Sequence, residues 1–182
     1  MPTVLAILAE GFEEIETVAP IDLLRRAGAE VTVAALREGL HVTGRSGITL
    51  HTDTTLAALE TGAPRDFDCV FLPGGPGVKH LRADARVRAL VLRQHTSNRW
   101  IAAICGAPTV LLDAGLLEGR RYTAHFSVAA ELPHLLADER VVADGRILTS
   151  RGAGTSVEFA LQLVEKLFSP EKAAEVARSI YA

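Results

Sequence analysis

The sequence contains only two cysteines, Cys69 and Cys105, among its 182 residues. A secreted protein stapled by disulfides needs a much denser set of cysteines. We therefore expect a reduced, cytoplasmic protein without a disulfide framework, although a single bridge between the two cysteines stays open. Because cysteine is this rare here, each one has to be explained as a core residue or as a reactive thiol.

Long apolar runs and concentrated positive charge are also missing. No segment approaches the roughly 20 apolar residues of a membrane-spanning helix. The stretch Met1–Ala9 lacks the basic start of a signal peptide. The net charge is -3, and lysine and arginine are spread along the chain. We therefore expect no membrane partner and no specific nucleic-acid binding, which requires clustered cations.

Motifs for cofactors and metals are absent too. The chain has no G-x-G-x-x-G with a later ribose-binding acid, no phosphate loop with its lysine, and no two histidines at the spacing of a metal motif. The sequence therefore predicts neither a cofactor nor a metal. It contains no repeat, linker or low-complexity stretch, so residues 1–182 are expected to form one domain with a substantial core.

Hydrophobic residues make up 48% of the chain and gather in short runs that predict buried strands. The runs are Val4–Ala9, Glu30–Ala35, Cys69–Leu72 and Trp100–Ile104. Segments with helical spacing of apolar residues alternate with them: Glu13–Ala27, Ala85–His95, Ala107–Ala114, Val157–Phe168 and the stretch after Ser169. Continuously apolar strands that alternate with helices are typical of a parallel sheet covered on both faces. The expected fold class is α/β.

Several shorter features complete this prediction. Leu40–Asp53 is expected to form a small β-hairpin, Leu56–Leu59 and Val128–Leu132 short helices, and Gly62–Asp66 a loop. Asp144-Gly145 is a strong signal for a two-residue hairpin turn. Thr155 and Glu158 have the spacing of a capping box at the start of the helix that follows.

The segment Trp100–Leu112 contains the best candidate for chemistry, Cys105. This cysteine follows a predicted strand and precedes a predicted helix, so it lies on a strand-to-helix corner, where a nucleophile is exposed at the edge of a sheet. The free N–H groups and the dipole of that helix favour an anion there. We therefore expect a thiol with a lowered pKa, although a buried structural cysteine is the alternative.

Two other segments should reach the same sheet edge. Gly74 and Gly75 end the third predicted strand, and with Gly106 their backbone N–H groups are expected to form an oxyanion hole, although an ordinary turn has the same composition. After the first strand come four glutamates: Glu10, Glu13, Glu14 and Glu16. A carboxyl buried against the thiolate would keep its proton. Spacing does not choose among the four, and His125 is a weaker candidate for moving a proton.

Four motifs then resemble one known group of proteins: L-A-E-G-F-E-E-I-E-T, F-L-P-G-G, A-A-I-C-G-A-P and I-L-T-S-R-G-A-G-T-S-V-E-F-A-L. In this order, and along nearly the whole chain, they are similar to the DJ-1/PfpI superfamily, in particular its parkinsonism-associated deglycase branch, among the class I glutamine amidotransferase-like proteins. The resemblance implies a flavodoxin-like three-layer sandwich, with a mostly parallel central sheet, helices on both faces and a small β-hairpin. It also implies a homodimer.

The resemblance further implies catalytic roles for Cys105, Glu16 and His125, and it matches Gly74, Gly75 and Gly106 to the family's backbone donors. Glu16 becomes the protonated carboxyl in this view. Relatives that act as peptidases carry histidine directly after the cysteine, where this chain has Gly106. Phe126 and Ala153 replace prolines that close relatives often have, which affects the rim of the pocket rather than its chemistry.

The implied activity is that of a cysteine-dependent, glutathione-independent glyoxalase and a deglycase of proteins and nucleotides. Its substrates would be methylglyoxal, glyoxal and their early adducts, and its products hydroxy acids. A second hypothesis is a redox-responsive chaperone or stress sensor in which Cys105 is oxidised. A third and weaker one is an amidase or cysteine peptidase.

Overall fold

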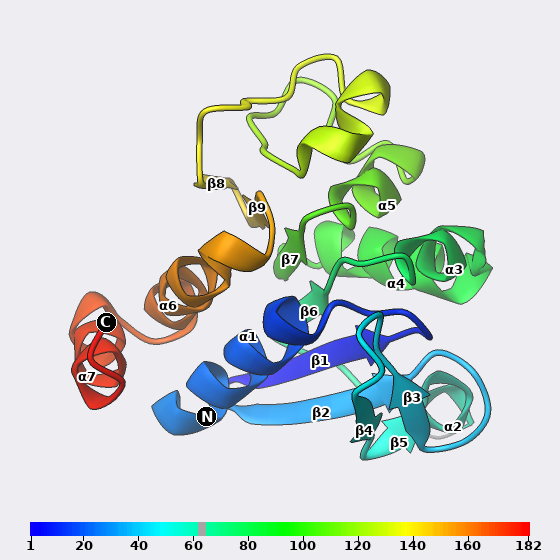
Figure 1. The fold of residues 1–182 in the computed structure, drawn as a ribbon, viewed down its shortest axis with the longest axis horizontal. Coiled ribbons are helices and arrows are strands. Elements are labelled where there is room, and N and C mark those ends of the chain that lie inside the picture. Colours follow the sequence, from blue (N-terminus) through cyan, green and yellow to red (C-terminus); the bar gives the residue numbers. More distant parts are fainter. Residues whose placement is uncertain (62–64) are drawn as a thin grey trace.

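The computed structural model describes residues 1–61 and 65–182 and contains a seven-stranded central sheet (Figure 1). The strand order is β5-β2-β1-β6-β7-β9-β8, and all neighbours are parallel except β8 and β9. The strands are β1 (Thr3–Leu8), β2 (Glu30–Ala35), β5 (Thr54–Thr55), β6 (Cys69–Leu72), β7 (Trp100–Ile104), β8 (Val141–Asp144) and β9 (Ile147–Ser150). The four buried strands predicted from apolar runs are therefore confirmed.

Helices cover both faces of this sheet. One face carries α1 (Glu14–Ala27), α6 (Ser156–Leu167) and α7 (Pro170–Ser179). The other carries α2 (Leu56–Glu60), α3 (Val78–Ala83), α4 (Ala85–Thr96) and α5 (Pro108–Asp113). The expected flavodoxin-like three-layer α/β fold is confirmed.

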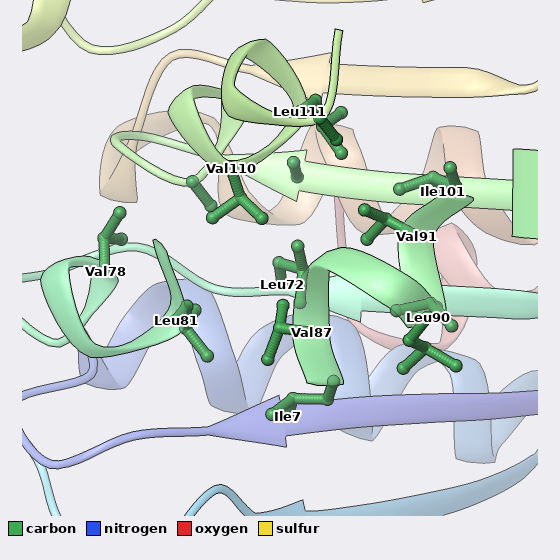
Figure 2. Close-up of a cluster of buried hydrophobic side chains, with 14 of the residues drawn as sticks. Ile7, Leu72, Val78, Leu81, Val87, Leu90, Val91, Ile101, Val110 and Leu111 are labelled. Atoms are coloured by element: carbon green, nitrogen blue, oxygen red, sulfur yellow. The ribbon is translucent and has the colours of Figure 1, made fainter. Parts of the chain in front are cut away.

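The two layers of core follow from the alternation of side chains along the strands. In β1, Leu5 and Ile7 belong to the cluster beneath α3, α4 and α5, while Val4, Ala6 and Leu8 belong to the cluster beneath α1 and α6. Figure 2 shows the first cluster, in which side chains of three strands face side chains of α4 and α5. The strand residues are Ile7, Leu72 and Ile101, and the helix residues are Val87, Leu90 and Val91 of α4 and Val110 and Leu111 of α5. Truncating a fully buried leucine in such a core to alanine costs about 2–5 kcal/mol.

The predicted hairpin is present as a separate two-stranded sheet, β3 (His41–Thr43) and β4 (Thr49–His51). The buried side chain of Val42 anchors the hairpin to the core beneath α1 and α6. Backbone hydrogen bonds tie it to the loop after β1, from Gly11 N to Thr43 O at 2.8 Å and from Arg45 N to Phe12 O at 2.8 Å. The hairpin is therefore coupled to the loop that leads into α1.

Some local predictions need correction. The capping-box prediction is wrong. The Thr155 side chain makes no capping hydrogen bond to α6, because its hydroxyl is hydrogen-bonded to Ser150 Oγ at 2.6 Å. Glu158 forms an ion pair with Arg140 instead. The short helix near Val128 is a 3₁₀ helix, η1, over Phe126–Glu131. The helix α3 and the strand β5 were not predicted.

The hairpin predicted at Asp144-Gly145 is present, but its turn is shifted by one residue. Asp144 is the last residue of β8 and pairs with Ile147, so the two turn residues are Gly145, with a φ of 57°, and Arg146. Residues 62–64 of the expected loop lie outside the described residues. Within the part that the structure describes, no helix combines the length and apolar character required to cross a bilayer.

Candidate active site

Three loops meet where the direction of chain progression across the sheet reverses. The chain moves from β1 to β2 on one side and then returns to β6 and β7 on the other side. Ligands of open α/β sheets bind at the carboxyl ends of the strands beside such a reversal. The segments there are the loop after β1, Pro73–Gly77 after β6, and Cys105 after β7. The sequence-based expectation that these segments converge is confirmed.

Cys105 occupies a strained backbone position between β7 and α5. Its φ is 64°, in the left-handed region, which costs an L-residue about 1–2 kcal/mol. The backbone on both sides holds this conformation, because Cys105 N donates to Ser150 O and Cys105 O accepts from His125 N, each at 2.9 Å. The side chain is only partly buried. The predicted strand-to-helix corner at Cys105 is confirmed.

Glu16 is buried beside this thiol, in the first turn of α1. Its side chain is 1% exposed, and its Oε2 accepts a hydrogen bond from Gly74 N at 3.1 Å. The Glu13 carboxylate caps the helix by accepting from Glu16 N at 2.7 Å. Burial raises the pKa of Glu16 to about 7, although a hydrogen bond with Cys105 acts in the opposite direction. This carboxyl can therefore hold a proton near neutral pH.

The other three glutamates have different environments. Glu10 accepts from Thr43 N at 3.1 Å and is exposed. Burial acts to raise the pKa of Glu14, but backbone hydrogen bonding, chiefly from Ser46 N at 2.7 Å, holds it below its ordinary value. Glu14 is therefore an ionised carboxylate turned toward the hairpin, and Glu13 serves as a cap. The choice among the four that spacing left open falls on Glu16.

Gly74 makes the close approach of thiol and carboxyl possible. A Cβ atom at this position would lie 2.5 Å from Cys105 Cβ and 3.0 Å from Ile104 O, and it would overlap Glu16 Oε2. Its N–H donates to Glu16, so the expectation that Gly74 offers a free donor to an oxyanion is wrong. The backbone N–H groups of Gly75 and Gly106 act instead on the Cys105 thiol, whose pKa they lower. Of the three glycines expected to supply oxyanion donors, Gly75 and Gly106 are the two whose N–H groups face the thiol rather than Glu16.

The expected lowering of the Cys105 pKa is not found. Burial, followed by the charge of Glu16 and its hydrogen bond, raises the pKa of Cys105 to about 12, while hydrogen bonds from Gly75 and Gly106 lower it only partly. The helix that follows, Pro108–Asp113, is only six residues long, so its dipole is small. Two of the raising causes require an ionised Glu16. The thiol and the carboxyl therefore titrate as one unit that shares a proton.

His125 completes the group at the edge of η1. Its Nδ1 accepts from Ser127 N at 3.2 Å and lies 2.8 Å from Ser127 Oγ. Because Nδ1 accepts an N–H, a neutral ring carries its proton on Nε2. Its side chain borders the same cavity as Cys105 and Glu16. Ser127 was missed by sequence reasoning, since a serine two residues after a histidine is unremarkable.

These groups line a cavity of about 860 Å³. Its wall includes Cys105, Glu16, His125, Gly75 and Gly106, so the structure brings together five of the six predicted site residues, with Gly74 directly behind Glu16. Three cationic side chains at this cavity were missed by sequence reasoning: Arg45, Lys79 and Arg82. Two of them could have been found in the sequence, because Lys79 and Arg82 have the i, i+3 spacing of one helix face directly after the glycine-rich turn. Asp113 and Glu131 both pair with Arg82.

Cys69 plays no part in this site. It is fully buried in β6, burial strongly raises its pKa, and both cysteines are free thiols, so the bridge left open above is absent. Among the described residues, no group of three or more His, Cys, Asp and Glu side chains could hold a metal ion.

Comparison with known proteins decides the family. The DJ-1/PfpI family model matches residues 2–166. The chain belongs to the DJ-1/PfpI family. Within that family, Protein dj-1beta of Drosophila melanogaster is 41% identical over 97% of this chain and 95% of its own length. The crystal structure of Drosophila melanogaster DJ-1beta has a TM-score of 0.94 at 39% identity, covering 100% of this chain and 98% of that one. A Caenorhabditis elegans member named glutathione-independent glyoxalase DJR-1.2 is 36% identical over 90% of this chain and 87% of its own length.

Proposed function

We propose that this DJ-1/PfpI protein is a cysteine-dependent, glutathione-independent glyoxalase that also removes early glycation adducts from proteins and nucleotides. The observation that carries the proposal is the pairing of a thiol on a left-handed corner with a buried carboxyl whose pKa lies near 7. Such a pair supplies both a nucleophile and an acid that becomes a base once it has given up its proton. The glyoxalase name of the C. elegans relative supports the same reaction class.

The first step forms a carbon–sulfur bond. The Cys105 thiol first passes its proton to the Glu16 carboxylate. The resulting thiolate adds to the aldehyde carbon of methylglyoxal, and the carbonyl electron pair moves to oxygen, which takes that proton from Glu16. The product is a hemithioacetal, and Glu16 is now a carboxylate. The N–H groups of Gly75 and Gly106, which lie at the sulfur, are placed to stabilise the developing negative charge.

The second step is an internal oxidation and reduction that needs no external electron acceptor. The Glu16 carboxylate removes the hydrogen on the former aldehyde carbon as a proton, which gives an enediol, and returns it to the neighbouring carbon. His125 Nε2 gives its proton to the second oxygen and takes the hydroxyl proton of the first. Water then hydrolyses the thioester, which releases lactate and regenerates the thiol and its shared proton.

The peptidase alternative has less support. A cysteine peptidase needs an imidazole that accepts the thiol proton, but Gly106 follows Cys105 and the Nδ1 atom of His125 is occupied by Ser127. The partner of the thiol is a carboxyl instead. A panel of amide substrates that remains uncleaved would remove the amidase hypothesis.

Lactate production from methylglyoxal in the absence of glutathione tests the proposal. Cys105→Ala is expected to abolish turnover, and Glu16→Gln to lower kcat by about 10²–10⁴-fold, the usual contribution of a positioned acid or base. Cys69→Ala and Glu10→Gln are matched controls, because they remove a cysteine and a glutamate outside the cavity. Full activity in Cys105→Ala would refute the proposal.

Oxidation of Cys105 provides the second candidate function. A protonated Glu16 can donate a hydrogen bond to a sulfinate as well as to a thiolate, which favours a stress sensor at the same site. Intact mass after graded peroxide should show addition of two oxygens to wild type and Cys69→Ala but not to Cys105→Ala. If a client protein aggregates equally with oxidised and reduced protein, the chaperone role fails.

We also propose a homodimer. Ile15 and Val18 of α1 and Ile48 of the β3–β4 turn are large apolar side chains that are 56%, 46% and 55% exposed in the single chain. Covering such side chains is favourable in water. Sedimentation should give twice the chain mass for wild type, and Val18→Glu should shift it toward one chain. A monomeric wild type would contradict the proposal.

A further inference from the structure

The β3–β4 hairpin brings two histidines face to face on its surface. The register pairs His41 directly with His51, and both side chains are exposed. His51 Nδ1 lies 3.4 Å from His41 Nε2, and the ring centroids are 4.9 Å apart with an interplanar angle of 64°. Ten residues separate the two in sequence, which is no linear metal motif, so only strand pairing reveals them.

The backbone holds the two rings in this position. Thr52 N donates to Leu40 O, and Gly44 N donates to Ile48 O, one rung beyond each end of the paired segment. Because hydrogen-bonded and non-hydrogen-bonded pairs alternate in an antiparallel ladder, His41 and His51 form a non-hydrogen-bonded pair, whose side chains approach most closely.

The opposite face of the hairpin fixes which way the rings point. Val42 on that face is buried in the core. Successive side chains of a strand alternate between its two faces, so the two histidines point to solvent. On their side, Thr43 Oγ1 and Thr49 Oγ1 form the neighbouring pair at 3.0 Å. The histidine pair is therefore pre-organised, and little side-chain freedom remains to be lost when a ligand binds.

We propose that His41 and His51 chelate one divalent transition-metal ion. Zinc–nitrogen bonds of 2.0–2.1 Å at a tetrahedral angle place two ring nitrogens about 3.3 Å apart, close to the 3.4 Å found between these two. A hydrogen bond at this length is poor by comparison. Imidazole suits zinc, nickel and copper, and affinity among them is greatest for copper(II).

The ion at this site is exchangeable rather than structural. Within the described part of the chain no third His, Cys, Asp or Glu side chain joins the pair, so the remaining coordination positions belong to water or to an external ligand. A closed structural zinc site would need four protein ligands. The proposal is independent of the reaction proposed for Cys105, since the hairpin pair does not line that cavity.

Isothermal titration with copper(II) or zinc chloride tests the site. The Cys105→Ala variant serves as the background, because a free thiol also binds these ions. We expect one ion per chain, and an affinity at least about tenfold weaker after His41→Ala or His51→Ala, since even a partner of a ligand contributes 10- to 100-fold. His95→Ala removes an exposed histidine from α4 and should leave the affinity unchanged.

Electron paramagnetic resonance of the copper(II) complex adds a readout that a loss of folding would not imitate. The spectrum should show two equivalent nitrogen donors in the background protein and one in each single variant. Far-ultraviolet circular dichroism should be unchanged, because both side chains are exposed. An affinity in His41→Ala and His51→Ala equal to that of the background protein, or no binding by the background protein, would overturn the proposal.

Discussion

Replacing Glu16 by glutamine should remove a specific part of the pH dependence of folding. The pKa of Glu16 rises from an ordinary value of 4.5 to about 7, chiefly because of burial. The folded state therefore binds this proton more tightly than the unfolded chain does. The resulting stabilisation is fully present below pH 4.5 and is lost as the pH rises through 7.

The size of the effect follows from the two pKa values. At 1.36 kcal/mol for each pKa unit, the contribution is about 3 kcal/mol. For a chain of this length, that corresponds to a change in Tm of roughly 6–12 °C. Glu16→Gln carries no titrating proton, so this slope between pH 4.5 and 7.5 should disappear in the variant.

Urea denaturation at four pH values between 4.5 and 7.5 measures the difference. Subtracting the free energy of unfolding of Glu16→Gln from that of wild type cancels the other titrating groups at each pH. Glu10→Gln, an exposed carboxyl on the same loop, should retain the wild-type slope. If wild type and Glu16→Gln show parallel pH profiles, the protonated buried carboxyl and the mechanism built on it are both refuted.

Three further predictions concern other parts of the molecule. Gly74→Ala places a Cβ atom 2.5 Å from Cys105 Cβ, so it should lower the free energy of unfolding by about 1–3 kcal/mol and abolish lactate production. Gly154→Ala is the control: a Cβ atom there enters open space, so neither the stability nor the activity should change. Lys79→Gln should lower kcat/KM for a phosphorylated α-ketoaldehyde while sparing neutral methylglyoxal, because Lys79 lines the cavity; equal losses on both substrates would contradict this.

Asp84→Ala removes the cap of α4, an acceptor for Arg86 N at 2.9 Å, at a cost of about 1 kcal/mol at pH 7. Since Arg86 lowers the pKa of Asp84, the difference from wild type should shrink as the pH falls through that lowered pKa, and urea denaturation at pH 7 and pH 3 would show whether it does.

The sequence is sufficient for the layers of this fold but not for several of its details. Fully apolar strands and amphipathic helices decide the sheet and its faces because burial is their only favourable environment. Helix α3 was not predicted because its six residues follow directly on the Pro73–Gly77 segment, whose prolines and glycines indicate a turn. The Thr155 capping box failed because a tertiary partner, the Ser150 hydroxyl, competes for the same side chain.

The candidate site, like the fold, could be predicted from the sequence only in part. The corner position of Cys105 follows from the order of strand and helix alone. The pKa of Cys105 cannot be predicted in this way, because burial and the charge of Glu16 oppose the helix dipole. Burial and the position of Glu16 both depend on contacts between distant segments of the chain. The choice of Glu16 among four glutamates likewise needed the position of Gly74, 58 residues further along the chain.

The packing at Gly74 also tells a protein engineer where this pocket can be changed. With Ile104 O and Cys105 Cβ both within 3.0 Å of a Cβ atom at Gly74, the floor beneath the thiol admits no additional atom. Variation has to enter from the rim, where Arg45 and Lys79 line the cavity. A library for new aldehyde substrates should therefore randomise the rim and leave the floor intact.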